Sequence, residues 1–210
     1  MDHYNVLIAT PGRNVDMPYL KSLLNTLEVL QQQNISYKFI NQYSSQVAAA
    51  REGTIMNDNF LDITNNKPLL GQATYDVVIW IDSDMEWTPE DFLKLYHSDK
   101  DITSGVYVSD QGVLMYTPSD KAHLTQKDHI EITHAGFGFI AIKQGVFEKL
   151  PRPWFQTQYT KQVIDGKDYL IPFGEDYSFC TKARQGGFKI YLDPTVNVTH
   201  YKQIPLKIKL

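Results

Sequence analysis

The sequence has little cysteine, no long apolar run and no excess of basic charge. Its 210 residues include a single cysteine, Cys180, so no internal disulfide can form, which fits a reducing compartment. No apolar stretch approaches the roughly 20 residues of a membrane-spanning helix, and the first residues enter an expected strand rather than a signal peptide. The formal net charge of −4 gives no general affinity for nucleic acid or an anionic membrane. We therefore expect a cytoplasmic protein with no nucleic-acid partner and no transmembrane segment.

Two common nucleotide-binding motifs are also missing. The first apolar run, residues 4–10, ends in Thr10 and is followed by Pro11-Gly12-Arg13-Asn14, which matches neither GxGxxG nor the P-loop pattern. The specific dinucleotide and Walker interpretations therefore fail. The loop is either a cradle for a base or ribose or an ordinary turn from strand to helix.

The sequence does contain the pattern of a folded α/β protein. Hydrophobic content of 42% and charged content of 21% are typical of such proteins, and the length suits one domain. Apolar runs alternate with segments of helical spacing, as in a parallel sheet: 4–10, 18–32, 36–41, 46–61, 77–81 and 89–97. We predict an α/β fold, a Rossmann-type sandwich whose mostly parallel central sheet is flanked by helices, with a smaller mixed or antiparallel second half.

That second half contains shorter elements. We expect a strand at 101–108, paired with 113–117 through a turn, a short helix at 144–149 and a strand at 189–192. The segment 156–169 is polar and structurally ambiguous, and its length marks it as a candidate lid or substrate loop.

The most informative stretch is VVIWIDSDMEW, residues 77–87. An apolar strand ends abruptly in Asp82-Ser83-Asp84, and Thr88-Pro89-Glu90-Asp91 then begins a helix with an N-cap threonine and a proline at the first position. Ligands of open α/β sheets bind at the carboxyl ends of strands. In an extended chain Asp82 and Asp84 face the same way, with Ser83 turned aside, so they can hold a divalent cation and through it a diphosphate.

Other interpretations of this motif stay open. Aspartate is common after strands because it makes turns and caps helices. An EF-hand calcium loop fits poorly, because it would need glycine and glutamate where the sequence has Trp87 and Leu93. Arg51, in the segment 46–61, is either a solvated ion-pair partner or a phosphate ligand beside this edge.

A second informative stretch is IEITHAGFGFIAI, residues 130–142. Gly136 and Gly138 flank Phe137 in strand surroundings, which indicates a bulge or a ligand lying close to the backbone. We favour a hydrogen-bonded structural role for His134 over ligand contact.

The last clear helix begins at Gly174-Glu175-Asp176 and ends at Gly186-Gly187. Helical spacing places Asp176 on the inward face with Phe179, Cys180 and Ala183. Acids are also favoured at a helix start by the dipole, which would lower the pKa of Asp176, so an apolar wall or a neighbouring carboxylate would have to raise it for a general base. We interpret Cys180 as a core residue rather than a nucleophile.

Taken in order along the chain, these pieces resemble a small glycosyltransferase of the GT-A fold. The matching segments are Pro11-Gly12-Arg13, the helix bearing Arg51, Asp82-Ser83-Asp84 with Thr-Pro-Glu-Asp, Ser104-Gly105-Val106-Tyr107, Gly136-Phe137-Gly138, Gly174-Glu175-Asp176 and His200. The resemblance covers most of the chain. It departs at Glu52, which follows Arg51 where similar sequences often have asparagine.

The resemblance implies a role for each matching residue. It implies Mn²⁺ or Mg²⁺ held by Asp82, Asp84 and His200, with Asp84 as the more direct ligand. The nucleotide would contact Thr10, Pro11, Arg13, Arg51, Asp82 and Ser83, and the donor sugar Gly136, Phe137 and Gly138. Asp176, within Glu175-Asp176, resembles the base that deprotonates the acceptor in inverting members; a retaining outcome stays open if the base lies elsewhere.

The expected function is transfer of a sugar from a nucleotide-diphosphate sugar to an unknown hydroxyl or glycan acceptor. We expect one domain over residues 1–210, with a nucleotide-binding half at about 1–100 and a donor-sugar and acceptor half at 101–210. Three alternatives are a sugar nucleotidyltransferase, which calls for a richer Gly-rich basic first loop, a non-catalytic module that binds nucleotide sugars or glycans, and a phosphatase with Asp82 as nucleophile, for which the supporting Lys and Thr pattern is missing.

Overall fold

The computed structural model describes residues 1–57 and 63–202 of the chain. Its helices are α1 (Met17–Gln32), α2 (Val47–Met56), α3 (Pro89–His97), α4 (Val146–Lys149) and α5 (Glu175–Gln185), with 3₁₀ turns η1 (Pro68–Gly71) and η2 (Lys121–Thr125). Its strands are β1 (Asp2–Pro11), β2 (Tyr37–Gln42), β3 (Ala73–Ile81), β4 (Met85–Glu86), β5 (Ile102–Val106), β6 (Tyr116–Thr117), β7 (Ile130–Ile132), β8 (His134–Ala135), β9 (Phe139–Lys143), β10 (Gln158–Ile164), β11 (Lys167–Phe173), β12 (Ile190–Asn197) and β13 (Thr199–His200).

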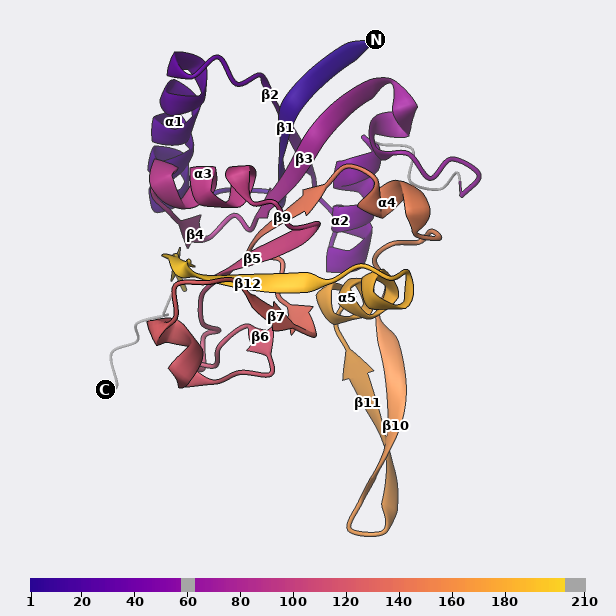
Figure 1. Cartoon of the computed structure of the whole chain (residues 1–210). Helices are drawn as coiled ribbons and strands as arrows, with labels where there is room; N and C mark the ends of the chain where they lie inside the picture. The colour runs from indigo at the N-terminus through magenta and orange to yellow at the C-terminus, as the bar shows by residue number, and fades with distance from the viewer. Residues whose placement is uncertain (58–62, 203–210) are drawn as a thin grey trace, which may run out of the picture.

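A seven-stranded sheet forms the centre of the molecule, in the order β2-β1-β3-β9-β5-β12-β7 (Figure 1). The neighbours β2/β1, β1/β3 and β5/β12 are parallel, whereas β9 and β7 are antiparallel to the strands beside them. Strands β2, β1, β3, β5 and β12 therefore all run the same way. The predicted α/β fold with a mostly parallel central sheet is confirmed.

Alternation along the central strands gives the sheet two apolar faces. In β3, Val77, Ile79 and Ile81 pack with buried residues of α1 and α3, such as Tyr19 and Phe92. On the other face, strand side chains pack with residues of α2, α4 and α5. The strand residues are Leu7, Ala9, Val78 and Trp80, and the helix residues are Ile55, Phe147 and Phe179. Both faces are covered because successive side chains of a strand point in opposite directions.

Local signals explain several helix ends. The Thr88 hydroxyl accepts a hydrogen bond from the Asp91 backbone N–H at 3.2 Å, and the Asp91 carboxylate accepts one from the Thr88 N–H at 3.0 Å. This capping box satisfies two N–H groups that the helix itself leaves unpaired, so α3 begins where the sequence predicts it. Helix α5 likewise ends at Gln185, with Gly186 at the expected C-cap position.

The first-half helix expected at 46–61 is shorter than predicted. Helix α2 ends at Met56, because Asn57 adopts the left-handed conformation and its N–H bonds to the Gly53 carbonyl, a recognised helix stop. Residues 58–61 of the expected helix lie outside the described part of the chain.

Several second-half elements also differ from expectation. The segment 113–117 pairs with the end of the expected strand over a short stretch, through the bridge between Val108 and Leu114 and the bond from the Met115 N–H to the Tyr107 carbonyl at 3.1 Å. Strand β6 pairs with β8. Strand β5 ends at Val106 rather than at 108, α4 begins at Val146 rather than at 144, and β12 continues to Asn197, beyond the expected end at 192.

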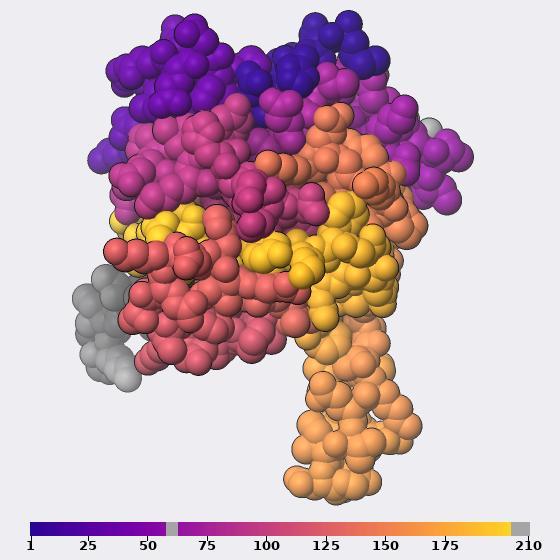
Figure 2. All heavy atoms as spheres, in the orientation of Figure 1, coloured from indigo at the N-terminus to yellow at the C-terminus, as the bar shows by residue number. Residues whose placement is uncertain are grey.

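The ambiguous segment 156–169 forms most of a β-hairpin. Strands β10 and β11 pair from Gln158↔Phe173 to Ile164↔Lys167, and they project from the body as an arm (Figures 1 and 2). Asp165 and Gly166 connect them with φ of 51° and 74°, the two positive values that a tight type I′ turn requires. Among the described residues, no helix is both long and apolar enough to cross a membrane.

Candidate functional site

A cavity of about 320 Å³ lies where β1 and β3 end, and we call it the edge cavity. Its walls come from the first strand-to-helix loop, α2, the Asp82-Ser83-Asp84 turn and the second half of the chain. The lining includes Pro11, Gly12, Tyr43, Ser44, Val47, Ala50, Arg51, Asp82, Ser83, Asp84, Tyr107, Met115, Phe137, Asp176, His200 and Lys202. The chain turns at 82–84, with the Met85 N–H bonded to the Asp82 carbonyl at 3.1 Å, rather than continuing extended. Both aspartates nevertheless face the same cavity.

Arg51 joins two acidic segments that are far apart in the sequence. Its Nη2 lies 3.0 Å from an oxygen of Asp82, and its Nε lies 3.0 Å from Glu175 Oε1. The side chain is only 5% exposed, and the guanidinium lies over the rings of Trp80 and Phe137. Arg51 is thus buried in ion pairs rather than solvated, and no partner is found for its buried Nη1 in the described part of the chain.

The pKa of Asp82 is raised above its ordinary value. Desolvation by the surrounding protein is the main cause, and the Asp84 carboxylate adds to it, while Arg51 opposes both. Burial lowers the pKa of Arg51, but Asp82 and Glu175 more than offset this and raise it overall. About a third of the Asp82 side chain, 32%, still contacts solvent, so this carboxylate is accessible from the edge cavity.

Asp84 lies beside His200, which strand β13 holds next to β4. His200 Nδ1 is 2.8 Å from the Val108 carbonyl oxygen, which can only accept, so Nδ1 carries a proton. His200 Nε2 is 3.2 Å from Asp84 Oδ2. In a neutral imidazole this nitrogen bears a lone pair facing the carboxylate, an arrangement that needs a proton or a metal cation between the two atoms.

The donor set at Asp84 and His200 fits a divalent cation. One ring nitrogen is held by a backbone carbonyl, as is usual for a metal-binding histidine, and the other faces a carboxylate oxygen. Lys202 Nζ, however, lies 2.7 Å from the same Asp84 Oδ2. Within residues 1–57 and 63–202, no three His, Cys, Asp or Glu side chains already gather closely enough to hold a metal ion. A cation at this position would compete with Lys202 for Asp84 Oδ2.

Asp176 lies in the first turn of α5 and differs from its neighbour Glu175. Its Oδ1 accepts a hydrogen bond from the Tyr177 backbone N–H at 2.7 Å, and no bond to another side chain is found for it among the described residues. Desolvation, followed by the charge of Glu175, raises the pKa of Asp176 above its ordinary value. The lowering expected from the helix dipole is therefore outweighed. Glu175, in contrast, is held by Arg51.

The two glycines around Phe137 make room for Tyr107. A Cβ at Gly138 would lie 2.7 Å from Tyr107 Cζ, and one at Gly136 would also overlap the phenol. The Tyr107 Oη accepts a hydrogen bond from the Gly138 N–H at 2.8 Å. The close approach that the glycines indicate is thus made by a side chain of the protein. Phe137 lines the edge cavity, while Gly136 lines a neighbouring one.

The first loop contributes part of what the sequence predicts. Pro11 and Ser83 line the edge cavity. Thr10 is fully buried, with its hydroxyl bonded to that of Tyr19, and does not line the cavity. Arg13 is exposed and lies 5.9 Å from the ring of Tyr43, a residue of the cavity wall that the sequence did not single out.

Glu52 has a structural role of its own. Its carboxylate accepts hydrogen bonds from Arg152 Nε at 2.8 Å and from the backbone N–H groups of Trp154 and Phe155 at 3.0 and 3.1 Å. It therefore fixes the segment that leads into the β10–β11 arm.

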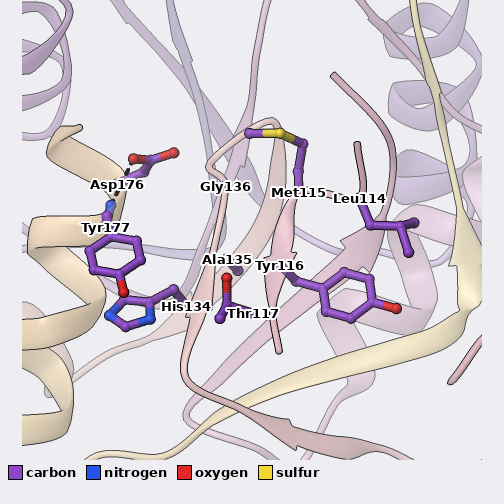
Figure 3. Close-up of a pocket in the computed structure, with 9 residues that line it drawn as sticks. All are labelled: Leu114, Met115, Tyr116, Thr117, His134, Ala135, Gly136, Asp176 and Tyr177. Atoms are coloured by element: carbon purple, nitrogen blue, oxygen red, sulfur yellow. Dashed lines mark hydrogen bonds between the residues drawn. The ribbon is translucent and has the colours of Figure 1, made fainter. Parts of the chain in front are cut away.

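Two further cavities adjoin the edge cavity. One of about 130 Å³, which we call the side cavity, lies between β6, β8 and the start of α5 and shares Met115 and Asp176 with the edge cavity (Figure 3). The other, of about 640 Å³ beside α2, shares Val47 with the edge cavity and is lined by Glu175. Asp176 is thus the acidic residue that faces both the edge cavity and the side cavity.

Comparison with known proteins identifies the fold but not a sequence family. No protein-family model matches this sequence, and a search of curated proteins finds no significant match. Among solved structures, A197 from STIV is similar over 100% of this chain and 99% of its own, with a TM-score of 0.55 and 19% identity.

Two glycosyltransferases are also similar in structure. GalNAc-T7, solved with UDP, GalNAc and Mn²⁺, matches over 95% of this chain with a TM-score of 0.52 and 15% identity; the chain spans 43% of its length. The catalytic domain of Drosophila β1,4-galactosyltransferase 7, solved with xylobiose, matches over 97% of this chain and 72% of its own, with a TM-score of 0.54 and 11% identity. The chain therefore has a GT-A-like fold.

Proposed function

We propose that this protein is a metal-dependent glycosyltransferase that moves a sugar from a nucleotide-diphosphate sugar to a hydroxyl acceptor with inversion. One observation carries the proposal: the Asp176 carboxylate, with a raised pKa, faces the same cavity as the Asp82, Asp84 and His200 group. In this proposal a base and a cation site line one cavity. The GT-A-like fold supports this, as does the presence of UDP and Mn²⁺ in the GalNAc-T7 structure.

Asp84 and His200, together with Asp82, would hold Mn²⁺ or Mg²⁺. Bound there, the cation would stabilise the negative charge that develops on the leaving diphosphate. Arg51 keeps Asp82 in place through the 3.0 Å contact. In this proposal Arg51 positions a carboxylate that faces the metal, and its Nη1 supplies one further hydrogen-bond donor.

The nucleotide would occupy the part of the edge cavity bordered by Pro11, Ser83 and Tyr43, with Arg13 at its rim. The donor sugar would lie against Phe137 and Tyr107, next to Asp176. In this proposal Gly136 and Gly138 leave space for the Tyr107 ring, and the Thr10 hydroxyl holds that of Tyr19. Residues of both halves, 1–100 and 101–210, line the cavity, as a nucleotide-binding half and a donor-sugar and acceptor half would require.

The transfer step follows from this placement. Asp176 accepts the proton of the acceptor hydroxyl while that oxygen forms a bond to the anomeric carbon. The bond from the anomeric carbon to the diphosphate oxygen breaks, and its electron pair leaves with the nucleoside diphosphate. The raised pKa of Asp176 strengthens it as a base relative to an ordinary aspartate. Glu175 is bound to Arg51 and serves to hold that arginine rather than to take the proton.

A thermal-shift panel separates the metal-binding role of Asp84 from the role of Asp176 as a base. UDP, GDP, CMP and their sugars are tested with and without Mn²⁺ on the wild type, Asp84→Asn, Asp176→Asn and the control Asp99→Asn, an exposed carboxylate on the loop before β5. A ligand at about 100 times its dissociation constant adds roughly 2.7 kcal/mol of stability. We expect one nucleoside diphosphate to stabilise all but Asp84→Asn in the presence of Mn²⁺. A shift that Asp84→Asn leaves unchanged would refute the proposed metal site.

A further inference from the structure

We infer that the side cavity is the acceptor subsite, and that it admits a single electrically neutral, hydroxyl-bearing sugar ring. This inference rests on the proposed function and adds the class of acceptor. The side cavity is the 130 Å³ space between β6, β8 and the first turn of α5 (Figure 3).

Position is the first argument. The acceptor hydroxyl must meet the donor sugar at the base, and Asp176 lines both the edge cavity and the side cavity. Met115 forms the other shared wall. The large cavity beside α2 is reached by Glu175 instead, whose carboxylate is engaged by Arg51 Nε at 3.0 Å. A hydroxyl that enters through the side cavity therefore meets an available carboxylate, whereas one that enters beside α2 meets an ion pair.

Charge is the second argument. Among the described residues that line the side cavity, Asp176 is the only carboxylic acid, and none is a lysine or an arginine. Burial, and to a lesser extent Arg184, lowers the pKa of His134 to about 4, so its ring is neutral there. Both His134 nitrogens already have partners, at 3.0 Å on Thr133 and 3.1 Å on Thr181. A carboxylate or phosphate on the acceptor would find no cation among the described lining residues and would be repelled by the Asp176 carboxylate.

Shape is the third argument. Ligand pockets for drug-sized molecules are roughly 300–1,000 Å³, so a cavity of about 130 Å³ holds one ring rather than an oligosaccharide. Leu114, Met115 and Ala135 give it apolar surface, and Thr117 gives a hydroxyl. The opposite wall is preformed, because the His134 and Tyr177 rings stack 3.4 Å apart and Tyr177 also stacks on Phe173 at the base of the arm, at 4.5 Å.

The test uses the methyl groups of methionine as a local probe. Protein labelled with ¹³C at the methionine methyls is titrated with methyl glucoside and methyl galactoside, and with the matching glucuronide and galacturonide. The Met115 signal is assigned with Met115→Leu. We expect at least one neutral glycoside to shift that signal, and its uronide to bind at least about tenfold more weakly, a difference of about 1.4 kcal/mol. Equal binding of the uronides would overturn the inference, as would no shift with any neutral glycoside.

Two variants at Thr117 and one control locate the site. Thr117 is exposed at the edge of the side cavity, so Thr117→Phe should fill the space and abolish the shift, while Thr117→Lys should favour the uronides. Val113→Phe, at a 54% exposed position of the same segment that lines neither cavity, should behave as the wild type. Shifts that survive both Thr117 changes would overturn the assignment.

The nucleotide panel distinguishes this inference from the proposed function. Metal-dependent nucleotide binding without any glycoside effect at Met115 would reject the acceptor subsite and leave the transferase standing. Glycoside binding at Met115 without any nucleotide binding would retain a sugar site and reject the transferase. Each experiment is scored on binding, so neither depends on finding the natural acceptor.

Discussion

Replacing Lys202 with methionine should strengthen the binding of Mn²⁺. The ammonium lies 2.7 Å from Asp84 Oδ2, the oxygen that also faces His200 Nε2 at 3.2 Å. A cation bound between Asp84 and His200 must displace this ammonium from the oxygen and tolerate its charge nearby. Lys202 therefore competes with the metal for one ligand atom.

The magnitude follows from the exposure of the pair. The Lys202 side chain is 45% exposed and that of Asp84 27%, so solvent screens their attraction. Pairs of this kind contribute about 0.2–1 kcal/mol. Removing the competitor should thus tighten Mn²⁺ binding by a factor of about 1.4 to 5, since 1.4 kcal/mol corresponds to a factor of about ten. Residual repulsion between the ammonium and the divalent cation would enlarge the effect.

Electron paramagnetic resonance of Mn²⁺ measures this directly, because the free hydrated ion gives a signal that is lost on binding. The control is Lys189→Met, which removes another exposed lysine that is paired at 2.8 Å with Glu131, away from the edge cavity. We expect tighter binding for Lys202→Met alone. Unchanged or weaker binding would show that Asp84 and Lys202 do not share the metal position, and the reasoning would fail.

Three further predictions follow from the same contacts. Transfer should fall as the pH drops through the pKa of Asp176, because the base must be unprotonated, and this fall should begin at a higher pH than an ordinary aspartate gives; a pH profile of turnover with no such limb would contradict it. Gly138→Ala should lower the free energy of unfolding, measured in urea, by about 1–3 kcal/mol, because the added methyl group overlaps Tyr107. Combining it with Tyr107→Leu should relieve part of that loss. Additive losses in the double variant would refute the packing argument. Arg51→Met should lower the free energy of unfolding by about 3–5 kcal/mol, because it leaves the carboxylates of Asp82 and Glu175 uncompensated. The control Arg13→Met, at an exposed position, should change it by under about 0.5 kcal/mol. Equal effects of the two changes would contradict the buried bridge.

Much of the fold could be predicted because its signals are local. The apolar run at 77–81 followed by Asp82 fixed the end of a central strand, and Thr88 with Asp91 marked the start of α3 three residues apart. Alternation of strands and helices predicted the sheet. One local signal was overlooked: Asp165-Gly166 is a strong hairpin turn, and it converts the expected loop into β10 and β11.

The rest depends on contacts between distant residues. Arg51 meets Glu175 across 124 positions of the chain, and helical periodicity cannot predict such a pairing. The glycines at 136 and 138 indicate that another group lies close to the backbone, but only the structure identifies that group as the Tyr107 side chain. The state of His200 is likewise set by the Val108 carbonyl, 92 positions away. Asp176 was predicted from helix register, whereas its raised pKa comes from tertiary burial.

The central claim is that sugar transfer takes place in the edge cavity. Identifying the phosphorus-containing product of the reaction tests this claim most directly. Wild-type protein and Asp176→Asn are incubated with the nucleotide sugar that stabilises the protein, Mn²⁺ and a mixture of neutral glycosides. The phosphorus products are then read by ³¹P NMR after the metal is removed with EDTA. We predict release of the nucleoside diphosphate by the wild type and almost none by Asp176→Asn. Release of pyrophosphate, or equal release by both proteins, would contradict the account.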